Sequence, residues 1–101
     1  DRIVFQVDDG DSNIDCVTEK DGTATTTDSG VDIESGTAVT LGFHVKSTGS
    51  VEFFVNRNKV ATHTANIPDD ENLALGAMEL SGSATGTKSM NIDYMFAAQN
   101  R

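Results

Sequence analysis

Several residue types are scarce in this sequence, and each scarcity narrows the choice of fold and function. The sequence has no tryptophan, one tyrosine, one proline and one cysteine. Because Cys16 is the single cysteine, the fold cannot depend on an internal disulfide. No apolar run approaches the roughly 20 residues that a membrane-spanning helix requires. We therefore expect neither disulfide bonds nor a membrane partner.

Positive charge is scarce as well. The sequence has 7 Lys and Arg against 16 Asp and Glu, a formal net charge of −9, and it contains no basic cluster. Nucleic-acid binding draws its affinity from positive charge that releases counterions from the phosphate backbone. We therefore expect no direct contact with DNA or RNA. The acidity fits a solvated position in an assembly, a neutral or cationic partner, or simply solubility.

Helical periodicity is also missing, whereas Thr, Val, Gly and Asp are abundant. Short candidate strands alternate with turn signals, a spacing typical of a sandwich or barrel. The sequence therefore predicts an all-β fold, an antiparallel β-sandwich, in one domain over residues 1–101. The predicted strands are Arg2 to Val7, Ile14 to Glu19, Thr23 to Thr27, Val31 to Glu34, Ala38 to Lys46, Val51 to Asn56, Lys59 to Thr64, Leu73 to Leu80 and Lys88 to Phe96. The turn signals are Asp9-Gly10, Asp21-Gly22, Ser29-Gly30, Ser35-Gly36, Gly49 and Arg57-Asn58, and a loop is expected at Ser81 to Thr87.

The middle of the chain predicts two hairpins in more detail. In the first, alternate residues of one strand are apolar, so that face should be buried; these residues are Val39, Leu41, Phe43 and Val45. In the second, a two-residue loop at Arg57 and Asn58 would hold the apolar face in phase. The expected pairs are Val55 with Val60, Phe53 with Thr62 and Val51 with Thr64. Phe54 would then lie on the opposite face, beside Ala61, which suggests partial cover there.

From about Val39 onward the chain contains short motifs that occur together in one family. Between Val51 and Pro68 they are Phe53-Phe54-Val55-Asn56, Asn58-Lys59, Val60, Thr62-His63-Thr64 and Asn66-Ile67-Pro68. Downstream they are Leu73-Ala74-Leu75-Gly76, Ser81-Gly82, Lys88 and Asn91-Ile92-Asp93-Tyr94, with weaker echoes upstream at Asp11-Ser12-Asn13 and Ser29-Gly30-Val31. Through these motifs the chain resembles the concanavalin A-like lectin/glucanase jelly roll of bacteriophage virion proteins.

The resemblance implies a jelly roll of about twice this length, since two packed sheets take up a dozen or so strands. One alternative is a C-terminal portion whose edge strands pair with a preceding segment, which fits a start at Asp1 directly before a strand-like run. The other is a shorter variant that completes its sheets against neighbouring subunits.

The function that the resemblance implies is structural. We expect a decoration or cement subunit, or an outward domain of a larger head protein, on the exterior of a phage capsid. Its partners would be the major capsid protein and neighbouring copies of itself. The alternative is a carbohydrate-binding, lectin-like module of a tail fibre or spike.

An acidic run at residues 8–15 offers oxygen ligands at alternating positions, as calcium prefers. The candidate ligands are Asp9, Asp11, Asn13 and Asp15. The helix-loop-helix calcium signature fails, because its central glycine would fall on Ile14 and its last glutamate on Lys20. An exposed turn explains the same residues through turn propensity. We therefore expect a turn and no metal site.

A second metal candidate is the row His44, Glu52 and His63. A tight turn would place His44 opposite Glu52, and the hairpin register above would place His63 on the other side of Glu52. Two imidazoles and a carboxylate could bind zinc or form a pH-dependent contact. However, three adjacent cross-strand residues rarely converge on a tetrahedral centre, and a Glu between two His is a favourable surface arrangement. We therefore expect a polar row, with no metal and no cofactor.

Catalytic spacing is missing too. The glucanase members of the family carry a Glu-x-Asp-x-x-Glu pattern, which this sequence lacks, and Asp32, Glu34 and Glu79 offer no substitute with matching spacing. Cys16 fits a small strand residue better than a nucleophile. We therefore expect no enzymatic activity and name no catalytic residue.

A glycan remains a possible partner on composition alone. Asn56, Asn58 and Asn66 could line a sugar pocket, but each is also a natural turn residue. Without tryptophan, and with Tyr94 in a predicted strand, an aromatic platform for a sugar is missing. We expect turns at these asparagines.

Overall fold

The computed structural model describes residues 1–47, 49–70, 73–74, 76, 92 and 95–97. The chain divides into two compact units, Asp1–Glu71 and Asn72–Arg101. Every strand of the described residues belongs to the first unit. The strands predicted at Leu73 to Leu80 and Lys88 to Phe96, and the loop between them, fall largely outside the described residues.

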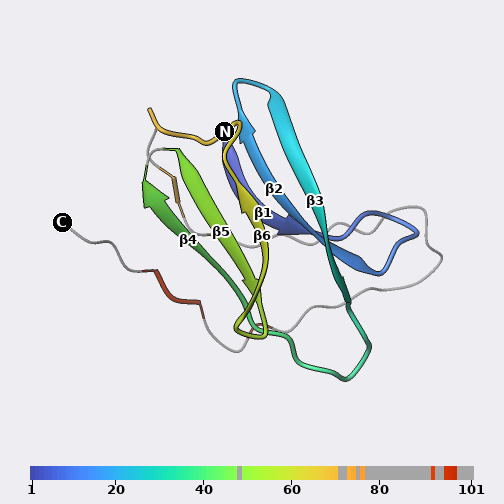
Figure 1. The fold of residues 1–101 in the computed structure, drawn as a ribbon. Helices are drawn as coiled ribbons and strands as arrows, with labels where there is room; N and C mark the ends of the chain where they lie inside the picture. The colour runs from blue at the N-terminus through green and yellow to red at the C-terminus, as the bar shows by residue number, and fades with distance from the viewer. Residues whose placement is uncertain (48, 71–72, 75, 77–91, 93–94, 98–101) are drawn as a thin grey trace. The chain divides into compact units, whose positions relative to one another are not determined.

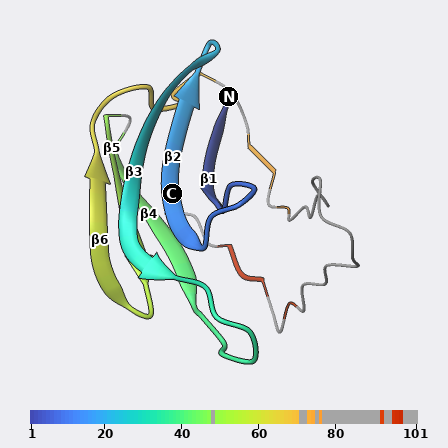
Figure 2. The same ribbon diagram turned by 90° about the vertical axis from the view of Figure 1, so that its right-hand side faces the viewer.

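The first unit consists of two antiparallel three-stranded sheets that lie against each other (Figures 1 and 2). The first sheet has the order β1-β2-β3 and the second the order β4-β5-β6. The strands are β1 (Arg2–Gln6), β2 (Asn13–Lys20), β3 (Thr23–Asp32), β4 (Leu41–Ser47), β5 (Ser50–Val55) and β6 (Asn58–His63). This arrangement confirms the all-β prediction and is consistent with a β-sandwich. The described residues include no helix that could cross a membrane.

Two of the predicted turns connect the strands of the first sheet. Asp21 and Gly22, with φ of 51° and 78°, form the two-residue loop between β2 and β3, where Lys20 pairs with Thr23. Asp-Gly suits such a loop, because both positions need positive φ and glycine adopts it at no steric cost. The turn between β1 and β2 is closed by the Asp11 amide, which donates to the Asp8 carbonyl at 3.1 Å.

The prediction of two strands on either side of Ser29-Gly30 is wrong. β3 continues from Thr23 to Asp32, and the register with β2 shifts opposite the step from Asn13 to Asp15. Gly30 takes a positive φ of 76°, and its amide donates to the Asp28 carboxylate at 2.7 Å. The glycine therefore accommodates an irregularity within one strand instead of ending it.

The predicted register of the β5–β6 hairpin is also wrong. The loop consists of Asn56 and Arg57, which both have positive φ (51° and 69°), one residue earlier than expected. Val55 pairs with Asn58, and a bulge between Phe53 and Phe54 shifts the pairing further along the hairpin. The observed pairs are Phe53 with Ala61, Val51 with His63, and Phe54 with Lys59 in place of Ala61. Because strand side chains alternate between faces, this change moves His63 to the face of Val51 and Phe53.

The core between the sheets is built around Phe53, whose side chain is completely buried. It packs with Cys16, Val51 and Ile67, and partly buried apolar residues of β1 and β6 surround this cluster. The rings of Phe5 and Phe53 meet edge to face, with centroids 5.3 Å apart. This geometry is the preferred one for aromatic pairs.

The apolar face of β4 is not buried as predicted. Its inward residues pair in register with the buried residues of β5 (Leu41 with Val55, Phe43 with Phe53, Val45 with Val51), so they point toward the first sheet. They nevertheless remain 43%, 42% and 45% exposed, and Val39 just before the strand is 37% exposed. The predicted alternation of apolar and polar residues along β4 is present, but burial also requires a strand of the other sheet above each apolar residue. In Figure 1, β4 lies on the side of the second sheet away from β3.

Replacing Arg57 by glycine should stabilise the fold. A side chain at φ of 69° is strained, and glycine removes the strain. We expect the free energy of unfolding to rise by about 0.5–1 kcal/mol, measured by urea denaturation. Arg57→Ala is the control, since it removes the charged side chain and keeps the strain. Equal stability of the two variants would contradict the left-handed turn.

Candidate functional site

The most unusual polar group of the first unit is His63, a histidine that is only 3% exposed. It ends β6 in the second sheet and reaches the first sheet with both ring nitrogens. Its Nδ1 lies 3.0 Å from the Thr18 hydroxyl on β2, and its Nε2 lies 2.9 Å from the Thr27 hydroxyl on β3. The imidazole also packs on Phe53, with centroids 4.9 Å apart. One side chain therefore joins three strands from both sheets.

The hydrogen bonds around His63 determine its tautomer. The Thr18 hydroxyl donates its single proton to the Ala65 carbonyl at 3.0 Å. It must therefore accept a hydrogen bond from His63, so that Nδ1 carries the ring proton. Nε2 is then the acceptor and receives the proton of the Thr27 hydroxyl. The result is a directed chain from Thr27 through His63 and Thr18 to the carbonyl of Ala65.

Burial also sets the charge of His63. Removing the imidazole from water disfavours its protonated form, and this lowers the pKa of His63 below the ordinary value of 6.5. None of its hydrogen-bond partners is a carboxylate that could stabilise the positive charge. His63 is therefore a neutral structural group at physiological pH.

The predicted row of His44, Glu52 and His63 does not form. His44 does lie opposite Glu52, with Nδ1 and Oε1 3.9 Å apart, as expected. His63 lies opposite Val51, because the bulge between Phe53 and Phe54 shifts the register by one residue. The imidazole of His63 therefore lies in the core and is not part of the row.

Lysines take the remaining places around Glu52. Lys59 donates to its carboxylate at 3.2 Å, and Lys46 lies at 3.9 Å. The hydrogen bond from Lys59 is the largest of the effects that lower the pKa of Glu52. Glu52 thus serves as the counter-ion of a basic group on the outer face of the second sheet.

The acidic run at residues 8–15 forms the predicted turn. One carboxylate oxygen of Asp11 accepts the amides of Ser12 and Asn13, at 2.7 and 3.1 Å. Asn13 directs its side-chain amide at Asp15 with a distance of 2.9 Å, so it acts there as a donor and not as an oxygen ligand. Asp11, Asn13 and Asp15, three of the four candidate ligands, are thus engaged in hydrogen bonds within this segment.

Asp15 also faces a carboxylate that the sequence inspection missed. It pairs across the hairpin with Asp28 of β3. Desolvation is the main cause that raises the pKa of Asp15, followed by the negative charges of Asp8, Asp28 and Asp11. Counting outward from the Asp21-Gly22 loop would have located this pair. Among the described residues, no group of three His, Cys, Asp or Glu side chains could hold a metal ion.

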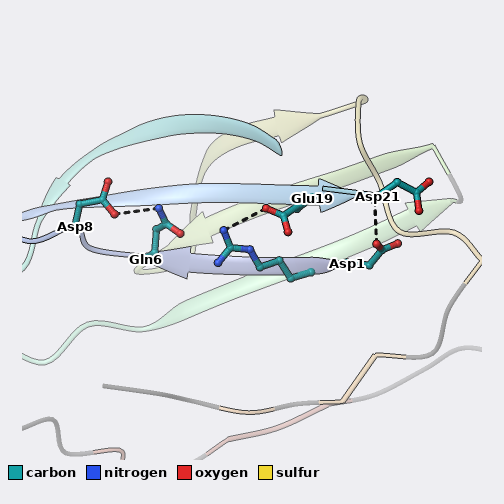
Figure 3. Close-up of polar contacts among 6 residues, drawn as sticks. Asp1, Gln6, Asp8, Glu19 and Asp21 are labelled. Atoms are coloured by element: carbon teal, nitrogen blue, oxygen red, sulfur yellow. Dashed lines mark hydrogen bonds and ion pairs between the residues drawn. The ribbon is translucent and has the colours of Figure 1, made fainter. Parts of the chain in front are cut away.

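Other polar contacts run along β1 and β2 (Figure 3). Gln6 donates to Asp8 at 3.1 Å, and the Asp21 amide donates to the Asp1 carboxylate at 3.0 Å. Glu19 is paired with Arg2 at 3.4 Å. Exposed contacts of this kind contribute little to stability individually. They lie along the first sheet and its turns.

A hollow of about 420 Å³ lies at one end of the two sheets. Its lining includes Lys20, Asn66 and Asp69, and Lys20 forms a hydrogen bond with Asp69. Asn66 donates its side-chain amide to the Thr25 hydroxyl at 2.9 Å. No aromatic residue of the described chain lines this hollow, so a stacking platform for a sugar is missing there.

The remaining candidate residues take structural positions. Asn56 lies in the β5–β6 loop, and its side-chain oxygen accepts the Thr40 amide at 3.0 Å. Asn58 is exposed at the start of β6. Glu34 accepts the Thr37 amide through its carbonyl in a turn, whereas Glu79 lies outside the described residues.

Cys16 is fully buried, and burial raises the pKa of its thiol to about 11. A thiol with so high a pKa carries almost no thiolate at neutral pH and is a poor nucleophile. This agrees with its assignment as a small core residue of β2.

No family model, curated protein or solved structure matches this chain.

The threonines that hold His63 were not found from the sequence, because no local pattern brings β2 and β3 to the end of β6.

The stability of the fold should depend on pH through His63. Because its pKa is lower in the folded state, the unfolded chain binds a proton that the folded chain does not, in the window below 6.5. Stability should therefore be lost as the pH falls from 6.5 through the folded-state pKa. Urea unfolding at pH 8, 7, 6 and 5 measures this effect. An NMR titration of His63 with a midpoint at or above 6.5 would contradict the argument.

The two threonines should differ in their contribution. Thr18→Val removes a fully buried hydroxyl that bonds both the buried His63 ring and the Ala65 carbonyl, and we expect it to lower the free energy of unfolding by about 2 kcal/mol. Thr27→Val removes a half-buried donor and should cost about 1 kcal/mol. Thr26→Val, on the exposed side of β3, should stay within about 0.5 kcal/mol. Denaturant unfolding of the three variants gives the order, and equal losses for Thr18 and Thr26 would rule out the chain of hydrogen bonds.

Proposed function

We propose that this chain is a structural component of a bacteriophage virion, a concanavalin A-like jelly-roll module on the capsid exterior. It would act as a decoration or cement subunit, or as the outward domain of a larger head protein. Its partners would be the major capsid protein and neighbouring copies. The mechanism is mechanical, because surface complementarity across subunit junctions adds binding free energy without covalent chemistry.

The observation that carries the proposal is the exposed apolar row of β4, formed by Leu41, Phe43 and Val45. These side chains point to the inner face of a sheet and are still 42–45% exposed. Contiguous exposed apolar patches on a soluble domain mark sites of contact with another surface. A module with such an unfinished side suits an assembly, where a neighbour covers it.

The polar groups favour the same role. The buried His63 and its threonines stabilise the joint between the sheets, and the described residues contain no buried side-chain polar atom without a hydrogen-bond partner. Active and binding sites usually direct polar groups into a cleft. Here these groups bind one another, which supports a structural role over the lectin-like alternative. Of the asparagines considered for sugar binding, Asn56 lies in the β5–β6 loop and Asn66 donates to Thr25, whereas Asn58 begins β6.

The proposal predicts that the chain is found on phage particles. Mass spectrometry of purified particles of the phage that encodes it should detect the polypeptide in many copies, and cryo-EM should locate it outside the shell. Particles stripped of the protein should release DNA at a lower temperature, and added protein should restore them.

Binding to stripped particles also tests the row. Leu41→Lys, at a 43% exposed position, should weaken binding at least about 10-fold, since it places a charge in an apolar contact. Val7→Lys, at 38% exposure outside the strands, is the matched control and should bind normally. Saturable binding to a glycan array, together with absence from the capsid, would replace the structural proposal with the lectin-like one.

A further inference from the structure

The outer face of the second sheet carries positive charge that the order of the sequence does not reveal. Because Phe53 points into the core, Glu52 lies on the opposite face, where the pairing of β4 with β5 places it beside His44. Lys46 of β4 and Lys59 of β6 approach the Glu52 carboxylate from the two neighbouring strands, at 3.9 and 3.2 Å. Glu52 is the only acidic residue of these three strands. The face therefore keeps a positive charge in a chain with a net charge of −9.

A largely apolar hollow of about 310 Å³ adjoins these charges. It lies where Gly42 of β4 stands opposite Phe54 of β5, and a side chain at Gly42 would meet no atom within 4 Å. Phe43 and Phe54 contribute aromatic walls, and His44 and Arg57 line the same hollow. Ligand pockets usually measure about 300–1,000 Å³. The hollow is therefore small and suits a single large side chain.

Arg57 is the cationic group of this hollow. Elsewhere, Arg2 and Lys20 are each paired with a carboxylate, whereas Arg57 has no carboxylate partner within the described part of the chain. A guanidinium offers a carboxylate two parallel hydrogen bonds, so Arg57 suits an anionic ligand. Together with Lys46 and Lys59, it forms a basic face around an apolar hollow.

We propose that the basic face binds a short acidic peptide segment of a partner protein. One apolar side chain of the segment enters the hollow beside Phe54. Carboxylates that flank this side chain bind Arg57 at the hollow and the two lysines of the basic face. The inference goes beyond the proposed structural role. Of the apolar row on the other side of β4, only Phe43 also lines the hollow.

The hollow and the charges together select this class of ligand. An acidic sugar is disfavoured, because its hydroxyl groups would lose their hydrogen bonds to water against the aromatic walls. A nucleic acid is disfavoured by its length. Three strands spaced about 4.8 Å apart span only about 10 Å, so a long polyanion would extend from the basic face over the rest of an acidic chain, which repels it.

An NMR titration of the full chain tests the ligand. The probe is a synthetic pentapeptide with one phenylalanine between two pairs of glutamates. It should bind saturably, shift the amide signals of Gly42 and Arg57, and bind more weakly as the salt concentration rises. Replacing the four glutamates by glutamine, or the phenylalanine by alanine, should weaken binding at least about 10-fold.

Three results of this titration would overturn the proposal. The first is no binding at millimolar peptide, which includes the case of a chain that covers its own basic face. The second is equal binding of the three peptides. The third is tighter binding of an oligogalacturonate or of a short single-stranded DNA, which would replace the peptide by an acidic sugar or a nucleic acid.

Two variants test the site itself. Arg57→Gly should weaken binding of the pentapeptide at least about 10-fold, because it removes charge-assisted hydrogen bonds. Since the same change should stabilise the fold, weaker binding cannot be attributed to unfolding. Gly42→Val fills the hollow without a clash and should also weaken binding at least about 10-fold. Arg2→Gln, which removes an exposed arginine of the first sheet, is the control and should bind normally.

Unchanged binding by either Arg57→Gly or Gly42→Val overturns the site. The outcome can also be separated from that of the virion role. A chain that is present on particles but does not bind the pentapeptide refutes the peptide site alone. A chain that binds the pentapeptide as described but is absent from particles refutes the virion role alone.

Discussion

The apolar packing between the two sheets centres on the ring of Phe53. This side chain is completely buried, and it packs against Phe5 of the first sheet, Phe43 of β4 and the imidazole of His63. On the side of β6, the ring packs on His63, which is hydrogen-bonded to two threonines of the first sheet. On the side of β4, the close packing ends, and the apolar row of that strand remains exposed. The position of this one ring therefore separates a closed side of the sandwich from an open one.

On the closed side, the relative position of the strands is well defined because the central side chain, His63, is polar. A buried histidine must find partners for both ring nitrogens, since an unsatisfied buried donor or acceptor costs more than a hydrogen bond contributes. Thr18 and Thr27 lie on different strands, so the requirement is met only when β2, β3 and β6 are in one relative position. An apolar side chain at residue 63 would tolerate a slip between the sheets. The hydrogen-bonded chain through His63 gives the joint a unique register.

Local features of the fold could be predicted from the sequence. The predictions were wrong where pairing between residues distant in the sequence determines the structure. The Asp21-Gly22 loop and the pairing of His44 with Glu52 follow from turn chemistry and alternation alone. The register predicted for the β5–β6 hairpin was wrong for two reasons. An Asn-Arg loop is chemically less distinctive than Asp-Gly, and a bulge cannot be recognised from the amino-acid composition. A shift of one residue was enough to move His63 from a surface row to the core.

The sequence by itself determined the all-β class, the strands of the first unit within a few residues except for β3, which it divided in two, and the absence of a recognisable catalytic spacing. These properties follow from alternation, turn residues and composition, which act between neighbours in the chain. Only the tertiary structure decided which apolar face is covered and which polar residues meet. Leu41 and Val51 belong to equally apolar strands, yet Val51 is fully buried and Leu41 is 43% exposed. The difference is whether a strand of the opposite sheet lies above them, and no local pattern encodes that.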